Sequence, residues 1–151
     1  MTDYGEVLQL APDDAEAFNN RGLTFDALGD YDNAIKDFDA AIDLRPSFAE
    51  AHSNRGAVLE VTGDLDAALE EYKRSLDDDP ELASAHYNAA RLYSRTGDLA
   101  ASLKHLDRVL EIAPGMAEDA AHDEHLSWAL EMRSLRQENE GHQNEDQENE
   151  D

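Results

Sequence analysis

The sequence predicts an all-α protein, an α-solenoid of three helical hairpins followed by a C-terminal capping helix. The main observation is that prolines and glycines, which interrupt or end helices, recur every 34 residues along the chain of 151 residues. Internal repetition at such a period is the signature of stacked supersecondary units. The recurring residues are Pro12, Pro46, Pro80 and Pro114, and Gly29, Gly63 and Gly97, each glycine followed by an Asp.

Each repeat reads as two helices that meet at the Gly-Asp pair. Apolar residues recur with helical spacing on both sides of the pair, so we expect the glycine to end one helix in a left-handed conformation and the aspartate to cap the next. In the first hairpin we expect helices over residues 15–28 and 31–44. The residues expected to face inward there are Phe18, Phe25, Tyr31, Ile35, Phe38 and Ile42.

The same plan gives hairpins over residues 15–48, 49–82 and 83–115. Small residues recur where the two helices of a hairpin must approach closely, and a large side chain at these places is expected to force the hairpin open. They are Gly22, Gly56 and Ala90 in the first helices, and Ala34, Ala68 and Ser102 in the second helices.

Residues 1–14 align with the end of a second helix and its closing proline, with no first helix before them. We interpret them as the partial second helix of an incomplete repeat or as an N-terminal cap. Repeat stacks need a polar outer face at their ends. The apolar residues of this segment could therefore also pair with a second protomer, which makes a homodimer through the N-terminal end an alternative. These residues are Tyr4, Val7, Leu8 and Leu10.

After Pro114 the pattern changes, because Glu124 and Glu131 stand where the repeat requires glycine. We therefore expect no fourth hairpin, and one amphipathic helix over residues 116–136 that covers the third. Its covering side chains are expected to be Met116, Ala120, Ala121, Trp128, Met132 and Leu135. Residues 137–151 hold no Lys, no Arg and no apolar side chain, so we predict a disordered acidic tail that aids solubility or attracts a basic partner.

Composition excludes several classes of function. The 36 acidic residues against 12 Lys and Arg give a net charge of -24, which repels nucleic-acid phosphates and anionic lipid. The chain has no cysteine, so disulfides, thiolate nucleophiles and cysteine metal sites are ruled out. No secretory signal or membrane span is recognisable, and we expect a cytoplasmic protein. The excess of carboxylates also suggests adaptation to high salt.

The runs Asn-Arg-Gly-Leu-Thr-Phe-Asp-Ala-Leu-Gly-Asp-Tyr-Asp-Asn-Ala (20–34) and Ile-Asp-Leu-Arg-Pro (42–46) resemble tetratricopeptide repeats, and the resemblance covers roughly residues 15–114. It implies a right-handed solenoid whose first helices line a concave groove. It also implies a non-enzymatic adaptor or scaffold that binds an extended peptide or a partner helix in that groove. His52 and His86 depart from the pattern, standing where the first repeat has an aromatic, Phe18, and we expect them to pack in its place.

Candidate binding residues follow from the repeat. Asn20, Asn54 and Asn88 share one offset, and an amide can satisfy both the N–H and the C=O of an extended backbone. In the family, asparagines at this place contact bound peptide, which the resemblance extends to these three. The same surface is expected to include Asn19, Leu23, Ala57, Tyr87, Arg91 and Arg95, with the two arginines placed to meet a ligand carboxylate. The alternative is that the asparagines only join neighbouring helices and the arginines only bridge to local acids.

No residue pattern predicts catalysis, a cofactor or a metal. His122 and His125 have a spacing that suits two metal ligands, but the sequence offers no clear third. Two other non-enzymatic functions stay open besides the peptide-binding module. One is a structural protein that assembles into homo-oligomers, and the other is a charge-based chaperone for basic partners.

Overall fold

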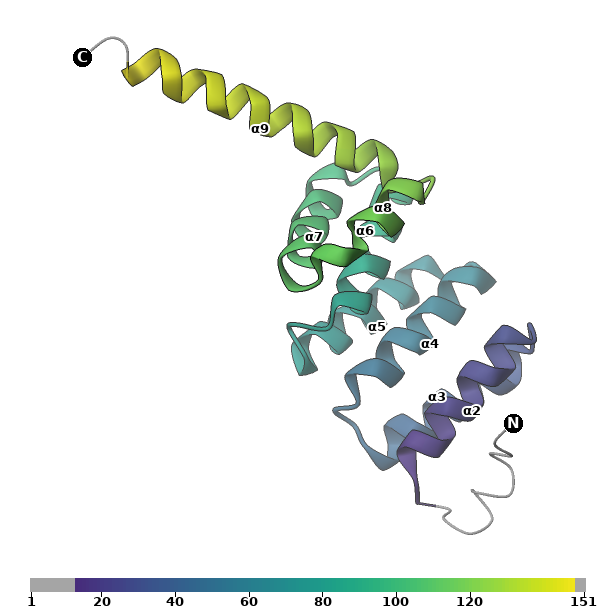
Figure 1. The fold of residues 1–151 in the computed structure, drawn as a ribbon. Coiled ribbons are helices and arrows are strands. Elements are labelled where there is room, and N and C mark those ends of the chain that lie inside the picture. The colour runs from purple at the N-terminus through teal and green to yellow at the C-terminus, as the bar shows by residue number, and fades with distance from the viewer. Residues whose placement is uncertain (1–12, 149–151) are drawn as a thin grey trace. The chain divides into compact units, whose positions relative to one another are not determined.

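The computed structural model describes the backbone of residues 13–148 and the side chains of residues 13–137. Within these limits the secondary structure is helical throughout, with no strand (Figure 1). The chain divides into two units, Met1–Asn88 and Ala89–Asp151, which are described in turn. Of the predicted N-terminal part-repeat or cap over residues 1–14, residues 1–12, which include the suggested dimer contact, lie outside the described residues.

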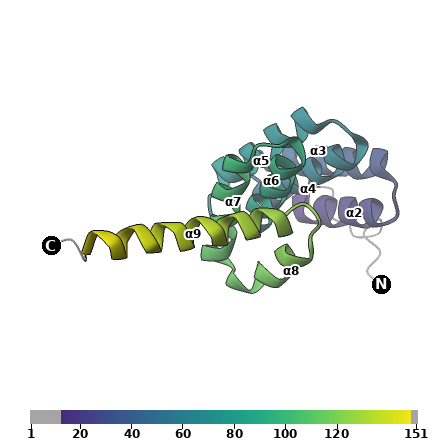
Figure 2. The ribbon, with the colours of Figure 1, turned by 90° about the horizontal axis from the view of Figure 1, so that it is seen from above.

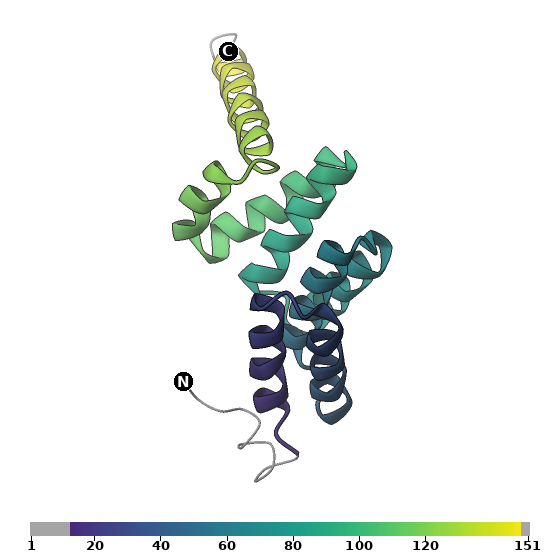
Figure 3. The ribbon, with the colours of Figure 1, turned by 90° about the vertical axis from the view of Figure 1, so that its right-hand side faces the viewer.

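The first unit contains two complete helical hairpins. α2 (Ala15–Ala27) pairs with α3 (Tyr31–Leu44), and α4 (Ala49–Thr62) pairs with α5 (Leu65–Asp78). Figure 3 shows α2 and α3 side by side as the purple and blue pair. α6 (Ala83–Thr96) begins in this unit and ends in the second. The helices predicted over residues 15–28 and 31–44 are confirmed, with a one-residue difference at the end of the first.

The hairpin turns form as the Gly-Asp pairs predict. Gly29, Gly63 and Gly97 have φ of 75°, 95° and 87°, the left-handed conformation that side-chain-bearing residues avoid. The following aspartate then caps the next helix with its carboxylate; that of Asp64, for example, accepts the amide N–H of Ala67 at 3.3 Å. Because both signals are local, each hairpin is specified by its own turn.

Close approach of the two helices in a hairpin explains the recurring small residues. A Cβ built on Gly22 would lie 2.7 Å from Cε1 of Phe38, and one on Gly56 would lie 2.7 Å from Cε1 of Tyr72. Both aromatic rings are fully buried, so they have no free volume to move into. Burial of one such ring contributes about 2–3 kcal/mol, and glycine on the facing helix permits it.

The apolar side chains of the first unit form two clusters. One contains Ala15, Ala41, Phe48 and Ala51, with Phe18 and Ile42 packed against it. The other contains Ala34, Phe38 and Val58, with Phe25, Tyr31 and Ile35 packed against it. All six residues expected to face inward in the first hairpin belong to these clusters, which confirms the helical periodicity.

The second unit holds the rest of α6, followed by α7 (Leu99–Ile112), the 3₁₀ turn η1 (Pro114–Met116), α8 (Ala117–His122) and α9 (Ser127–Glu148). Two helices therefore stand where a single helix over residues 116–136 was expected. The interruption falls at Asp123, whose carboxylate accepts the backbone N–H of His125 at 2.8 Å and of Leu126 at 3.2 Å. An aspartate that binds the amides ahead of it starts a new helix instead of continuing the old one.

The covering face of these helices also differs from the expectation. Ala120, Leu126 and Ala129 are fully buried, whereas Trp128 is 50% exposed and Leu135 is 46% exposed. The restart at Asp123 shifts the phase of the following helix, so residues before and after it do not share one continuous face. Ala120 is the one predicted covering residue that is fully buried.

α9 continues through Glu148 and so gives helical backbone to most of the segment 137–151, which was expected to be disordered. Figures 1 and 2 show its C-terminal half extending beyond α7. Glu and Gln, which dominate this segment, are good helix formers. Near its start, α9 is fixed to α7 by Arg133 and Arg136, which both pair with Asp107.

No helix in the described part of the chain is both long enough and apolar enough to cross a membrane.

Candidate functional site

A hydrogen bond between two asparagines joins neighbouring first helices in the first unit. Asn54 on α4 donates from its Nδ2 to Oδ1 of Asn19 on α2 at 2.9 Å. The next repeat has a weaker equivalent, in which Asn88 Nδ2 donates to Oγ of Ser53 at 3.5 Å. Each bond spans 35 residues, one repeat plus one position. The helix-to-helix role that the sequence left open is therefore one role these amides have.

The bond uses only part of each amide. A carboxamide has two N–H donors and one carbonyl acceptor. Among the described residues, the NH₂ group of Asn19 and the carbonyl oxygen of Asn54 have no hydrogen-bond partner. Asn19 is 93% buried by its neighbours, being 7% exposed, which fixes the position of its NH₂ group. The pair thus offers one fixed donor and one acceptor on the side of the unit where α2 and α4 lie, which we call the first-helix face.

A pocket of about 260 Å³ adjoins this pair. It is lined by Glu16, Asn19, Asn20, Arg45, Phe48 and Glu50. The guanidinium of Arg45 lies 4.4 Å from the ring centre of Phe48 and donates to Glu16 at 3.1 Å. Asn20, the first member of the predicted asparagine series, is exposed at the pocket wall.

The other predicted site residues are distributed between the two units. Leu23 on α2 is 40% exposed, while Ala57 and Tyr87 are half-buried in the first unit. Arg91 and Arg95 follow on α6 but belong to the second unit, and each already makes an interaction of its own. The structure therefore assigns seven of the nine predicted residues to the first unit, namely Asn19, Asn20, Leu23, Asn54, Ala57, Tyr87 and Asn88.

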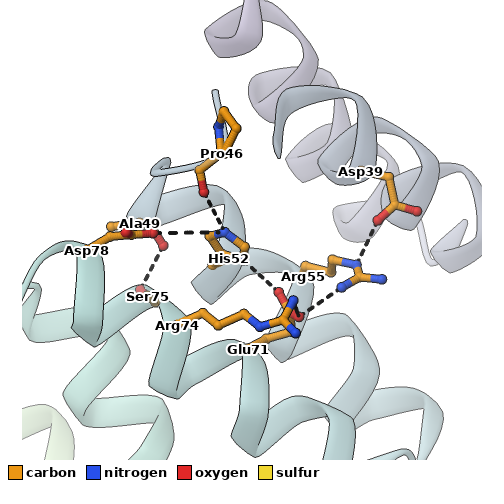
Figure 4. A network of polar contacts seen from close by, with 9 residues as sticks. All are labelled: Asp39, Pro46, Ala49, His52, Arg55, Glu71, Arg74, Ser75 and Asp78. Carbon is orange, nitrogen blue, oxygen red and sulfur yellow. Dashed lines mark hydrogen bonds and ion pairs between the residues drawn. The ribbon is translucent and has the colours of Figure 1, made fainter. Parts of the chain in front are cut away.

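A buried polar network holds the two hairpins of the first unit together (Figure 4). His52 contacts Oε2 of Glu71 through Nδ1 at 2.8 Å and the carbonyl oxygen of Pro46 through Nε2 at 3.1 Å. Arg55 pairs with Asp39 of the first hairpin at 2.8 Å and with Glu71 of its own hairpin at 2.9 Å. These contacts connect α4 to α3, to α5 and to the turn between the hairpins.

His52 and His86 are both buried and both contact the carbonyl of the preceding turn proline, His86 at 3.0 Å from Pro80. They occupy the place of Phe18, as the sequence predicts, and add a polar contact that phenylalanine cannot make. Because their ring nitrogens are engaged in holding turns and helices, their environment is that of structural groups.

Sequence reasoning missed a repeated ion pair inside the hairpins. Arg21 forms two hydrogen bonds of 2.6 Å with Asp37, and the equivalent Arg55 pairs with Glu71. These hydrogen bonds raise the pKa of the Arg21 guanidinium. The signal was available, since the arginines and their acids recur at the repeat interval.

On the same helix as Arg21, partial burial raises the pKa of the Asp26 carboxyl.

His122 and His125 show no arrangement typical of a metal site. Nδ1 of His122 contacts the backbone carbonyl of Glu118 at 2.7 Å, and His125 lies 3.3 Å from the exposed carboxylate of Glu124. Within the described residues no three potential metal ligands come together.

Helical hairpins of equal length, repeated with one offset and closed by the same turn residues, define a helical-repeat protein. The family model described as tetratricopeptide repeat matches residues 2–47, 19–83 and 62–117. The chain belongs to the tetratricopeptide repeat family. The helical-solenoid fold class predicted from the sequence is thereby confirmed, and membership supports a protein–protein interaction module.

Solved structures share this fold. A crystal structure of MamA superposes with a TM-score of 0.71 at 23% identity, over 89% of this chain and 77% of that one. A second crystal structure of MamA protein gives a TM-score of 0.70 at 23% identity, over 89% of this chain and 72% of that one. No curated protein matches the chain in sequence.

Proposed function

We propose that the chain is a non-enzymatic adaptor or scaffold that binds an extended peptide segment of a partner protein on its first-helix face. The observation that carries the proposal is the Asn19–Asn54 pair, which leaves one amide donor and one carbonyl acceptor open beside each other. The backbone of an extended peptide presents the matching groups, a C=O for the Asn19 NH₂ and an N–H for the Asn54 oxygen.

This chemistry favours an extended segment over a partner helix. A helix satisfies its own backbone groups and offers only side chains to a groove. An extended segment keeps its backbone N–H and C=O groups available, and amide recognition of these groups does not depend on the peptide sequence. The exposed Leu23 adds an apolar contact on the same helix as Asn19. A net charge of -24 supports a protein partner over nucleic acid or anionic lipid.

The proposal is tested with a variant that separates binding from helix packing. Asn19→Ser keeps an oxygen that can accept from Asn54, as Ser53 does for Asn88, but removes the open NH₂ group. Displayed random peptides of about twelve residues, a length typical of linear-motif ligands, are selected on the full chain. We expect Asn19→Ser to weaken the selected peptides by about tenfold, the effect of losing one hydrogen bond.

The matched control is Asn33→Ala, which removes an amide on α3 whose partners are the capping Asp30 and the exposed Lys36. This variant should bind the peptides as the wild type does. Peptides that bind Asn19→Ser and the wild type equally well, with both proteins folded by circular dichroism, would contradict recognition through this amide pair. Failure to select any peptide would contradict the module itself.

A further inference from the structure

The pocket beside Asn19 has a chemical character that backbone recognition does not explain. Glu16 and Glu50 occupy equivalent places in the first turns of α2 and α4, and both line the pocket. Arg45 neutralises Glu16 by the 3.1 Å contact. Glu50 has no ion pair within the described part of the chain, so the pocket holds one carboxylate charge in excess.

The pocket also contains two acceptor groups that are not used within the described side chains. The carboxylate of Glu50 and the amide oxygen of Asn20 have no partner among the described side chains. Arg45 is the one cationic side chain in the lining, and it is held between Glu16 and the Phe48 ring. A ligand with a positive charge and hydrogen-bond donors therefore complements the excess carboxylate charge and the two open acceptors.

A second, independent feature points to a ligand at the same place. Asn19 lines this pocket and is 7% exposed, yet its NH₂ group has no partner within residues 13–137. The bond from Asn54 to its Oδ1 holds the Asn19 amide in place, so its NH₂ group is a positioned donor that a ligand in the pocket can use. The Asn19 NH₂ group complements a backbone carbonyl of the peptide. A peptide residue bound there would lie next to the open acceptors of Glu50 and Asn20.

We propose that this pocket binds the primary ammonium group of a lysine side chain in the bound peptide, an inference that rests on the proposed function. Glu50 forms the ion pair, the Asn20 oxygen accepts a second N–H, and Asn19 donates to the backbone carbonyl of that same lysine. The apolar stem of the lysine lies along Phe48. An ammonium is favoured over a guanidinium because its three N–H groups point in different directions and can meet acceptors from two different helices, whereas the planar guanidinium fork is best matched by two acceptors in one plane.

The test uses four short peptides of about seven residues, long enough to span one such site. Three are capped at both ends and alternate alanine and serine around a central lysine, norleucine or arginine. The fourth carries norleucine and a free N-terminal amine. Binding to the full chain is followed by backbone amide signals in two-dimensional NMR at about 150 mM KCl, which screens distant charges.

We expect the lysine peptide to bind about fivefold more tightly than the norleucine peptide, the effect of one partly exposed ion pair. Glu50→Gln should remove this preference and leave binding of the norleucine peptide unchanged. The matched control is Glu70→Gln, an equal change of charge at an exposed residue of α5, which should retain the preference. At equal saturation, the amide signal of Glu50 should shift further with the lysine peptide than with the norleucine peptide.

The remaining outcomes each decide a point. Equal binding of the lysine and norleucine peptides, with both lost in Asn19→Ser, overturns the lysine pocket and leaves the proposed function standing. If Glu50→Gln and Glu70→Gln lose the preference for lysine equally, the preference is a general charge attraction, and the lysine pocket is overturned as well. Tighter binding of the arginine peptide or of the free N-terminus would assign the pocket to that group instead. If no peptide shifts any signal, both proposals fail.

Discussion

Replacing Gly56 by alanine tests how tightly the second hairpin is packed. The added Cβ would lie 2.7 Å and 2.9 Å from two carbons of the Tyr72 ring and 3.2 Å from the backbone oxygen of Ala68. The ring cannot swing aside freely, because Tyr72 is 1% exposed and its hydroxyl donates to Glu60 at 2.9 Å. One of the two helices must therefore move, and the second hairpin should open.

The size of the effect follows from two opposing contributions. Overpacking of a filled core costs about 1–3 kcal/mol, whereas alanine gains about 1 kcal/mol over glycine in helix propensity. At Gly56 the clash includes a backbone atom and a tethered ring, so we expect the upper end, a net loss of about 2 kcal/mol. At Gly22 the three nearest atoms all belong to the Phe38 ring, which has no hydroxyl, and we expect a net loss of about 1 kcal/mol or less.

The assay is urea unfolding followed by circular dichroism, with the Gly22→Ala variant as the matched comparison. Both variants change a glycine in the middle of a first helix, so differences in helix propensity cancel. The expected result is a lower midpoint for Gly56→Ala than for Gly22→Ala, with both below the wild type. A Gly56→Ala protein as stable as the wild type would refute the argument that close approach requires glycine there.

Three further predictions concern α9, α2 and the surface charge. Trp128→Ala should leave the melting temperature nearly unchanged, because the side chain is half exposed. Leu126→Ala, at a fully buried position, should lower the free energy of unfolding by about 2–4 kcal/mol. Comparable losses of stability in the two variants would contradict the assigned covering face. Burial raises the pKa of Asp26, so the folded state binds this proton more tightly than the unfolded state and wild-type stability increases as pH falls through that pKa. Asp26→Asn should therefore be more stable than the wild type at neutral pH. Thermal unfolding should show that this advantage vanishes in acid. Stability should climb steeply with added KCl because a net charge of -24 repels itself, and a flat dependence would count against salt adaptation.

Hairpins could be predicted from the sequence because their signals are local. Gly63 sets the backbone of its turn and Asp64 caps the next helix, whatever the rest of the chain does. The covering face could not be predicted in the same way. Helical spacing was extended from Met116 to Leu135 as one helix, but the carboxylate of Asp123 binds two backbone amides and restarts the phase. A single polar side chain thereby reassigns which apolar residues are buried.

Repeat spacing also identifies positions without identifying partners. It puts Asn20, Asn54 and Asn88 at one offset of the repeat, but the residue bonded to Asn54 is Asn19, at another offset. It likewise shows which contacts stop repeating. The first two hairpins each contain an arginine–carboxylate pair, but the equivalent residues of the third repeat are Ala89 and His105. His105 instead stacks on Tyr93, with 5.6 Å between the ring centres.

The Asn19–Asn54 bond makes helix packing and ligand binding depend on the same two side chains, and the variants separate these roles. Asn54→Ala removes both the bond to α2 and the open acceptor, so it should lower stability as well as affinity. Asn19→Ser should lower affinity alone, because the serine oxygen still accepts from Asn54. If instead both variants lost stability equally and kept their affinity, the amides would serve only to join α2 and α4, and recognition would have to reside in other side chains of the first-helix face.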